Sequence, residues 1–296
     1  MEKSSYFNRI KVFVTHYFGG LFNRIDDHHV FLNASGLAFE LFLCIIPFIL
    51  IIFAVLGSIL ASNNIQYQIN LLIDTIIPYE EYSEFVKKII FTRINEVIEY
   101  KTIAGIIGGF GLFFAASGLF SSMRTILNQV FGVTKSVNLL LWKLSDFALV
   151  VMVILIFFLT TICAPIIVVL GQSASQFEAL AFFKASVFHH FFLSLLSFTI
   201  IFFVFSVLYI AVPLKKLRKR SIMVSAFWAA LLWEAAKQLF GYYLYHFSSF
   251  GKIYGTYALV VVVAFWIYFS SVVFIVGAEI GKLFQERLES AHLNQI

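Results

Sequence analysis

Four charged residues lie inside long apolar runs of this 296-residue chain, and their chemistry calls for an explanation. They are Glu40, Glu234, Lys237 and Glu279. If these runs cross a lipid bilayer, each charge at the bilayer centre costs about 2.5–3.5 kcal/mol by insertion measurements. Such a charge therefore either pairs with an opposite charge or lines a polar path. The chemistry predicted is ion pairing, or the binding and passage of a polar solute.

Glu234 and Lys237 are three residues apart, which places both on one face of a helix. Gln238 and Tyr245 extend the same face. One interpretation is an internal ion pair that neutralises itself and ties two helices together. The other is a polar site inside a helix bundle. Both stay open at this point, because an ion pair can also hold a gate shut.

Glu279 and Glu40 lie closer to the ends of their apolar runs. Glu279 has Lys282 one turn further on, and we expect both side chains to reach headgroups and water by snorkelling. Glu40 has no oppositely charged neighbour in the sequence and precedes Pro47 by seven residues. We expect Glu40 to face a water-filled vestibule on the cytoplasmic side. All of these residues are candidates for substrate binding or gating.

The composition predicts what kind of protein must hold these charges. Apolar residues make up 61% of the chain and charged residues 12%, whereas soluble domains average roughly 45–50% and 25%. The mean hydropathy is +0.93. A soluble enzyme is excluded by this shortage of surface charge. The fold class predicted is all-α, a polytopic helical membrane protein with amphipathic interfacial helices.

Six apolar runs are long enough to cross a bilayer, which needs about 20 helical residues. The predicted transmembrane spans are 36–60, 102–121, 146–170, 187–212, 222–246 and 256–281. No repeat or linker-like tract divides the chain, so residues 1–296 are predicted to form a single integral membrane domain.

Two segments outside the spans have helical apolar stripes. Residues 1–35 form a predicted cytoplasmic amphipathic N-terminal segment. Residues 61–101 form a predicted extracytoplasmic helical layer, interrupted at Pro78. This layer is either a lid on the bilayer or a surface for a partner.

The basic residues predict the orientation of the chain. Most of the 21 Lys and Arg residues, Arg24 and Arg124 among them, fall on the side of the N-terminus. By the positive-inside rule both termini are cytoplasmic. Five basic residues share one short loop: Lys215, Lys216, Arg218, Lys219 and Arg220. They are a topology anchor and candidates for binding acidic lipid headgroups. Nucleic acid is not expected as a partner, because no aromatic residues are interleaved with these charges.

Two pairs of glycines have the spacing that allows close helix approach, Gly105 with Gly109 and Gly277 with Gly281. We expect packing within the chain, with a homo-oligomer seam as the alternative. The sequence contains no GxSxG, HExxH, Walker A or paired CxxC pattern. We therefore expect no catalytic residues, no metal and no other cofactor, and any transport would draw on an ion gradient or a partner.

Several ordered motifs resemble the YihY/BrkB family of bacterial inner-membrane proteins. They are the segments 225–240 and 247–255, Gly277-Ala-Glu-Ile280, the first-span motif from Ala34 to Pro47, Leu127-Asn128 followed by Phe131-Gly132, and Val212-Pro213. The positions of Asn128, Glu234, Lys237, Tyr254, Gly255 and Glu279 match the family pattern. Glu40 stands where the family usually has an uncharged residue, and Phe131 replaces a Trp.

The resemblance implies a six-span inner-membrane protein with both termini in the cytoplasm. The family carries three kinds of functional label: a historical ribonuclease label, a virulence or serum-resistance label, and transport, including transport of lipids or lipopolysaccharide precursors. The ribonuclease label is the least compatible with this chain, because it offers neither acid–base groups in water nor an electropositive groove. We expect a transporter or lipid translocator, with membrane lipids and a lipid or small-molecule substrate as partners. The alternative is a non-transporting scaffold or envelope-integrity protein.

Overall fold

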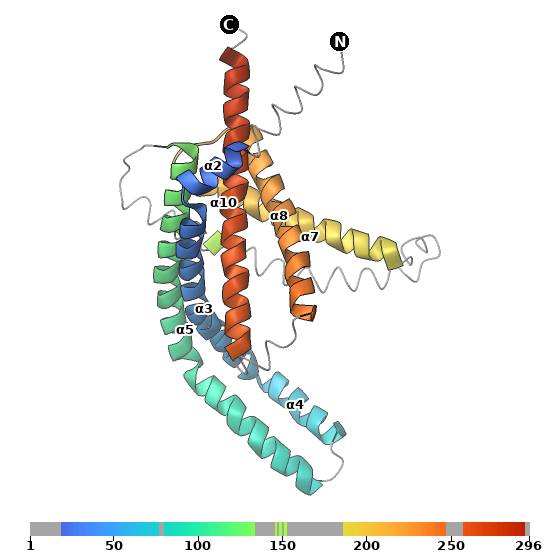
Figure 1. Cartoon of the computed structure of the whole chain (residues 1–296). Helices are drawn as coiled ribbons and strands as arrows, with labels where there is room; N and C mark the ends of the chain where they lie inside the picture. The colour runs from blue at the N-terminus through green and yellow to red at the C-terminus, as the bar shows by residue number, and fades with distance from the viewer. Residues whose placement is uncertain are drawn as a thin grey trace. The chain divides into compact units, whose positions relative to one another are not determined.

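The computed structural model describes residues 19–76, 80–133, 146, 148–149, 151–152, 186–246 and 257–293, and the regular structure in these ranges is helical throughout. The helices are α2 (Gly20–Asp27), α3 (Val30–Leu60), α4 (Asn63–Ile76), α5 (Glu80–Phe131), α7 (Ser186–Ala211), α8 (Lys219–His246) and α10 (Ala258–Leu293) (Figure 1). The all-α prediction is confirmed for the part of the chain that is described.

Three of these helices are long and apolar enough to cross a membrane: Val30–Leu60, Ser83–Phe131 and Ala258–Ser290. They contain the predicted spans 36–60 and 102–121 and most of 256–281. The predicted fourth span lies on α7, whose apolar stretch Ser197–Ala211 is shorter. The predicted fifth span lies on α8, a continuous helix that carries charges at mid-length. The third, 146–170, lies outside the described residues except for positions near its start.

The helix boundaries differ from the sequence prediction in two places. α3 begins at Val30, before the predicted boundary at residue 36. α5 is a single helix of 52 residues, so the second half of the predicted extracytoplasmic layer and the second span are continuous. No Pro or Gly occurs between Glu80 and Lys101, and without such a breaker helix propagation is favourable.

The chain divides into two compact units, and the boundaries fall within α3 and α5. One unit contains Met1–Phe39 and Leu119–Ile296, and the other contains Glu40–Gly118. The single membrane domain stays a prediction.

In the unit Glu40–Gly118, α3 and α5 pack through glycines of α5. A Cβ atom at Gly108 would lie 2.9 Å from the carbonyl oxygen of Pro47, and one at Gly105 would lie 3.3 Å from Ala54 Cβ. Residue numbers fall on α3 as they rise on α5, so the helices are antiparallel. The expected approach at Gly105 is confirmed, but the expectation for Gly109 is wrong, because nothing lies within 4 Å of a Cβ there. Gly109 borders open space beside α3 instead of a close helix contact.

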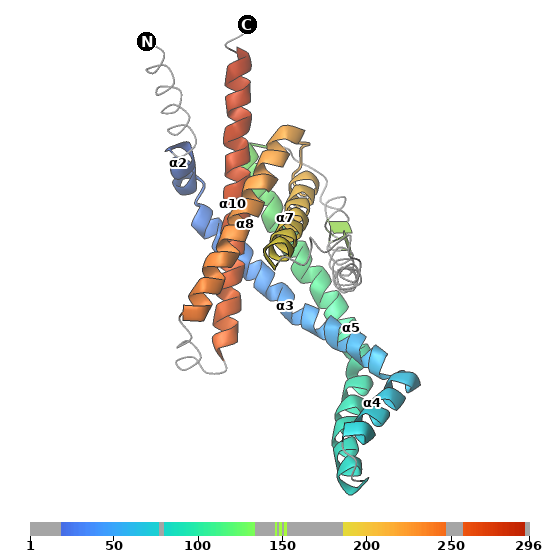
Figure 2. The same cartoon turned by 90° about the vertical axis from the view of Figure 1, so that its right-hand side faces the viewer.

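In the other unit, α8 packs along both α7 and α10 (Figure 2). A Cβ atom at Gly277 of α10 would lie 2.7 Å from Ala229 Cβ, and one at Gly281 would lie 2.9 Å from the Ser221 carbonyl oxygen. Small residues on both helices therefore permit close backbone approach. The prediction that Gly277 and Gly281 pack within the chain is confirmed.

An aromatic layer joins α7 to α10 beside this contact. The rings of Tyr209 and Phe274 stack with centroids 5.2 Å apart. The Tyr209 hydroxyl is fully buried and donates a hydrogen bond of 2.6 Å to the Phe274 carbonyl oxygen. A buried hydroxyl needs such a partner, because an unpaired one costs about 1–3 kcal/mol. This layer fixes α7 and α10 on either side of α8, and so positions the polar residues described next.

Candidate functional site

The polar residues of α8 and α7 meet near the middle of α8. Lys237 Nζ lies 2.6 Å from Glu234 Oε2 and donates a hydrogen bond of 3.2 Å to Ser197 Oγ of α7. Gln238 Nε2 donates to Glu234 Oε1 at 3.2 Å. The structure thus brings together three of the predicted candidates and adds Ser197, which is not among them. Ser197 could have been found only by knowing which faces of α7 and α8 meet.

This ion pair is open on one side. The Lys237 side chain is 39% exposed and that of Glu234 is 22% exposed. An ion pair whose only function is to tie helices together gains most when it is enclosed and fully hydrogen-bonded. A partly exposed ammonium can instead exchange its carboxylate partner for an incoming anionic group without leaving either charge unsolvated.

Glu279 lies in a different environment and does not pair with Lys282. Its side chain is 0% exposed, with Oε1 2.6 Å from His28 Nδ1 and Oε2 3.3 Å from Arg24 Nη1. The expectation that Glu279 reaches water by snorkelling is wrong. A carboxylate on this face of α10 is covered by α2, so the side chain has no route to water and is compensated by two basic groups instead.

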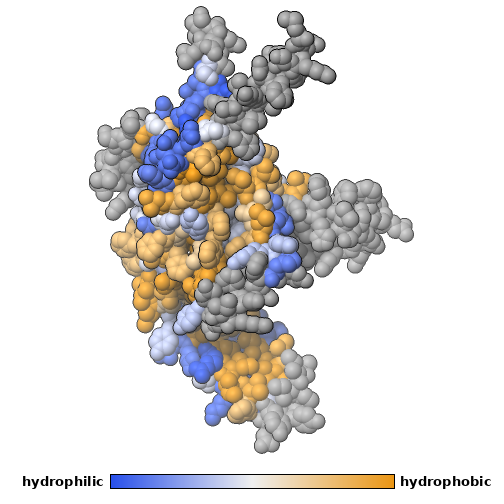
Figure 3. Space-filling model, in the orientation of Figure 1, coloured by the Kyte–Doolittle hydropathy of each residue, from blue (hydrophilic) through white to orange (hydrophobic). Residues whose placement is uncertain are grey.

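Arg24 also binds Glu286 of α10, with Nη2 2.6 Å from Oε2, and Lys282 Nζ lies 3.7 Å from Glu286 Oε1. Arg24, His28, Glu279, Lys282 and Glu286 therefore form one polar cluster, the α2–α10 cluster. Hydrophilic residues gather there on the surface (Figure 3). From the sequence alone, Arg24 is only one of the basic residues that predict the topology.

The turn after α2 holds His28 in place. His28 and His29 link α2 to α3, and His29 has a positive φ of 47°. Asn33 Nδ2 donates a hydrogen bond of 2.7 Å to the His28 carbonyl oxygen. Because backbone and side chain are both fixed, the imidazole is directed at α10.

Asn128 has a structural contact at the end of α5. Its Oδ1 accepts a hydrogen bond of 3.1 Å from the backbone N–H of Leu214. Gly132 closes the helix with a φ of +65°, and the Val133 N–H donates to the Asn128 carbonyl oxygen at 2.8 Å. This is the left-handed cap that favours glycine. Asn128 therefore attaches the end of α5 to the turn between α7 and α8.

Arg124 reinforces the same turn from one helical turn earlier. Its guanidinium pairs with Asp146, and its Nε donates to the Val212 carbonyl oxygen at 3.3 Å. Both charged side chains are buried. The sequence places Arg124 in a loop after the second span, whereas the structure places it within α5 with a buried, paired side chain; its position on the cytoplasmic side stays a prediction.

The remaining candidates are separate from these groups. The Glu40 carboxylate is half-buried and lies against Gly118, where a Cβ atom would come within 2.8 Å of Oε2. Glu40 forms no ion pair with any residue that the structure describes. Tyr254 lies outside the described residues. Within those residues, no group of three or more His, Cys, Asp or Glu could hold a metal ion.

The five basic residues of the predicted loop, which span the turn before α8 and its start, are all exposed: Lys215, Lys216, Arg218, Lys219 and Arg220. Lys219 and Arg220 occupy the first turn of α8. Cations there oppose the helix macrodipole, so these charges do not serve helix stability.

Long apolar helices with three candidate spans define an integral membrane protein that crosses the bilayer more than once. Residues 21–295 match the sequence model of the virulence factor BrkB family, and the chain belongs to that family. The family resemblance predicted from the motifs is thereby confirmed.

The relatives carry the name UPF0761 membrane protein. One from Pseudoalteromonas atlantica is 24% identical over 89% of this chain and 84% of the relative. One from Vibrio parahaemolyticus is 26% identical over 92% of this chain and 82% of the relative. One from Haemophilus influenzae is 24% identical over 91% of this chain and 95% of the relative. No solved structure matches the chain.

Proposed function

We propose that this protein is a six-span inner-membrane transporter that moves a lipid or lipid-like amphiphile, with both termini in the cytoplasm. The proposal assigns it neither an ATPase nor another enzymatic activity, and no cofactor. Glu234, Lys237, Gln238 and Ser197 form its polar site.

The observation that carries the proposal is the partly exposed ion pair at the middle of α8. A half-open pair at this depth is costly for a purely structural role. It suits a headgroup that carries a phosphate, because the phosphate oxygens can replace the Glu234 carboxylate on Lys237. The Ser197 hydroxyl keeps one hydrogen bond to the ammonium during this exchange.

The exposed basic loop supports the proposed orientation. Its five charges have no ion-pair partner among the described residues, and two of them oppose the dipole of α8. Retention of such charges fits a cytoplasmic loop at the surface of an anionic membrane.

A transport assay tests the proposal. The full-length protein is reconstituted in phosphatidylglycerol-containing vesicles, and the transfer of a fluorescent phospholipid between leaflets is followed. Glu234→Gln and Lys237→Met should each lower the rate at least about tenfold, which corresponds to the loss of one charge-assisted contact. Lys88→Gln, which removes an exposed charge of α5 that belongs to neither proposed site, serves as the control and should have little effect.

A charge-swapped double variant, Glu234→Lys with Lys237→Glu, separates transport from structure. If the pair only joins helices, the swap restores the behaviour of the wild-type protein. If Lys237 receives an anionic headgroup, the swap leaves transport impaired while thermal stability recovers. Full activity of both single variants, with normal folding, would exclude this site.

A second candidate is a non-transporting envelope-integrity scaffold. The sealed Glu279 and the structural role of Asn128 favour it, because both show family-matching polar residues used for assembly. In cells that lack the protein, detergent sensitivity distinguishes the two. Each variant is expressed in these cells. If the protein is a scaffold, Glu234→Gln and Lys237→Met should restore detergent resistance fully, whereas Arg24→Ala should not. If it is a transporter, none of the three variants should restore detergent resistance.

A further inference from the structure

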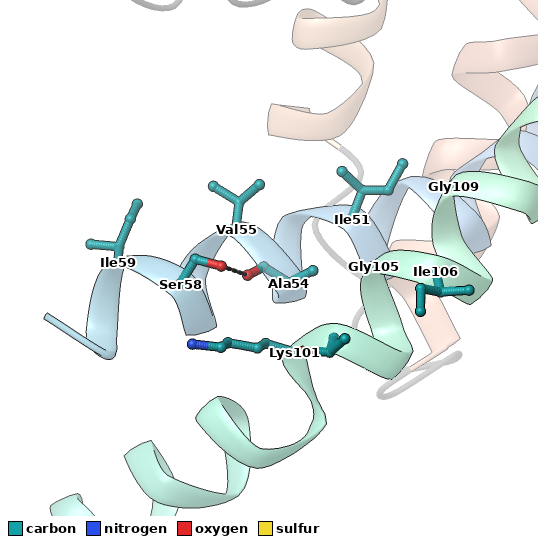
Figure 4. Close-up of a pocket in the computed structure, with 10 residues that line it drawn as sticks. Ile51, Ala54, Val55, Ser58, Ile59, Lys101, Gly105, Ile106 and Gly109 are labelled. Atoms are coloured by element: carbon teal, nitrogen blue, oxygen red, sulfur yellow. Dashed lines mark hydrogen bonds between the residues drawn. The ribbon is translucent and has the colours of Figure 1, made fainter.

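A groove runs between α3 and α5 within the unit Glu40–Gly118, with a volume of about 730 Å³ (Figure 4). Its walls are mostly aliphatic, and one basic residue lies at one end. The residues that matter here are Ile51, Val55, Ile59, Ile106, Gly109 and Lys101.

Glycines create this groove. A Cβ atom at Gly57 would lie 2.8 Å from the Val97 carbonyl oxygen and 2.7 Å from Lys101 Cβ, so the two backbones nearly touch there. Gly105 approaches Ala54 in the same way. At Gly109 a Cβ would meet nothing within 4 Å, although the residue lines the groove. The groove therefore has a closed floor and an open side.

Lys101 is directed along this groove. Its stem packs against Gly57, and the side chain extends beside α3 toward Ser58 (Figure 4). Ser58 also lines the groove, and its hydroxyl donates a hydrogen bond of 2.9 Å to the Ala54 carbonyl oxygen. The Lys101 side chain is half-buried and forms no ion pair with another described residue.

The aliphatic walls are open to the surroundings. Val55 is 40% exposed, Ile59 50% and Ile106 56%. On helices of this length and hydropathy such surfaces face acyl chains. Lys101 immediately precedes the span 102–121, which places its ammonium at the depth of lipid headgroups.

We propose that this groove is a binding site for an anionic glycerophospholipid, with the phosphate on Lys101 and one acyl chain along the aliphatic wall. Charge and shape both select this ligand: one cation lacking a carboxylate partner among the described residues meets the phosphate, and the groove continues as an apolar slot. Basic pockets between membrane helices bind headgroups in this way. The site rests on the membrane depth of the proposed spans, but not on the Glu234–Lys237 transport site, which lies on other helices.

Native mass spectrometry of the full-length protein in detergent tests the site. The probe is phosphatidylglycerol with palmitoyl and oleoyl chains, compared with diacylglycerol that carries the same chains and no phosphate. Lys101→Gln should lower phosphatidylglycerol binding about tenfold, whereas Lys101→Arg retains it. Gly109→Leu should lower binding similarly, because its side chain occupies the groove without touching α3. Lys88→Gln, an exposed lysine of the same helix, is the matched control.

Three results would overturn the proposal. Unchanged phosphatidylglycerol binding in Lys101→Gln would show that the lysine only reaches water by snorkelling. Equal binding of diacylglycerol would show that the phosphate is not recognised. Displacement of the lipid by millimolar inorganic phosphate would assign the site to a free anion. Glu234→Gln distinguishes this site from the proposed function. It should lose transport while phosphatidylglycerol binding at Lys101 stays intact.

Discussion

The Nδ1 atom of His28 and the Oε1 atom of Glu279 lie 2.6 Å apart, although 251 residues separate them in the sequence. Arg24 holds the other carboxylate oxygen at 3.3 Å. A fully buried carboxylate is stable only when opposite charges and hydrogen bonds compensate its desolvation. The short helix α2 is thereby fastened to the C-terminal helix α10.

Arg24→Ala should destabilise the protein by about 3 kcal/mol, because it leaves the Glu279 charge in a buried site with only His28. Thermal unfolding in detergent micelles measures the loss. Glu279→Gln together with Arg24→Ala should cost less than the sum of the single changes, since the double variant no longer holds an uncompensated charge.

The control for this pair is Glu289→Gln on the same helix. Glu289 is exposed and, among the described residues, accepts a hydrogen bond from Gln285 alone, so its replacement should shift stability by less than about 0.5 kcal/mol. A stability shift as large as that of Arg24→Ala would mean that the α2–α10 cluster contributes no more to stability than an exposed polar residue of α10.

Gly281→Ala should loosen the contact between α8 and α10. The added Cβ would overlap with Ser225 Oγ and approach the Ser221 carbonyl oxygen to 2.9 Å, so backbone must shift. We expect a loss of about 2 kcal/mol in the free energy of unfolding. Gly241→Ala is the matched control, because nothing lies within 4 Å of its Cβ position. There the greater helix propensity of alanine should stabilise α8 by up to about 1 kcal/mol. Equal effects of the two substitutions on the melting temperature would contradict the close packing at Gly281.

Local spacing predicted those features whose partners lie nearby in the chain. The pairing of Glu234 with Lys237 follows from helical geometry, and the close packing at Gly277 follows from the small-residue pattern. The partner of Glu279 could not be predicted, since only the tertiary fold brings α2 against α10. The positive-inside rule counts basic residues by the side of the membrane on which they lie, so it carries no information about the buried pairing of Arg124.

Helix ends were predicted less well for a related reason. Hydropathy shows where a helix enters the bilayer, but not where the helix itself begins. α5 continues from Glu80 through the predicted span because its polar half is also free of helix breakers.

Asn128→Ala should weaken the junction between α5 and the turn before α8. The substitution removes the acceptor of the Leu214 N–H, at a cost of about 1 kcal/mol. Asn128→Asp keeps an acceptor oxygen at the same place and should retain most of the stability. Hydrogen exchange at Leu214 is the direct measurement: it should accelerate in Asn128→Ala and stay slow in Asn128→Asp. If the two variants behave alike but both lose transport, Asn128 acts on the substrate and not on the turn.

The connection between α4 and the start of α5 should loosen at low pH. Asp74 accepts a hydrogen bond from Lys87, 2.9 Å away, and one of 2.6 Å from the Ser83 hydroxyl, and these contacts hold the pKa of Asp74 below its usual value. A carboxylate with a lowered pKa in the folded state stabilises the protein above its unfolded pKa, which is about 3.9. This contribution is lost as the pH falls through the lower, folded-state value. The protection of α4 amides against hydrogen exchange, taken relative to the intrinsic rate at each pH, should therefore fall below about pH 4 in the wild-type protein.

Asp74→Asn removes the titrating group. It should lower the protection of α4 amides at neutral pH and make that protection nearly independent of pH in the acid range. Ser83→Ala removes one of the two contacts, so the pKa of Asp74 should rise toward its usual value and the acid transition should move to higher pH. The exposed pair of Arg93 with Glu96 joins two residues of α5 to each other, and Glu96→Gln is the control. An acid transition that persists unchanged in Asp74→Asn would assign the effect to another carboxylate.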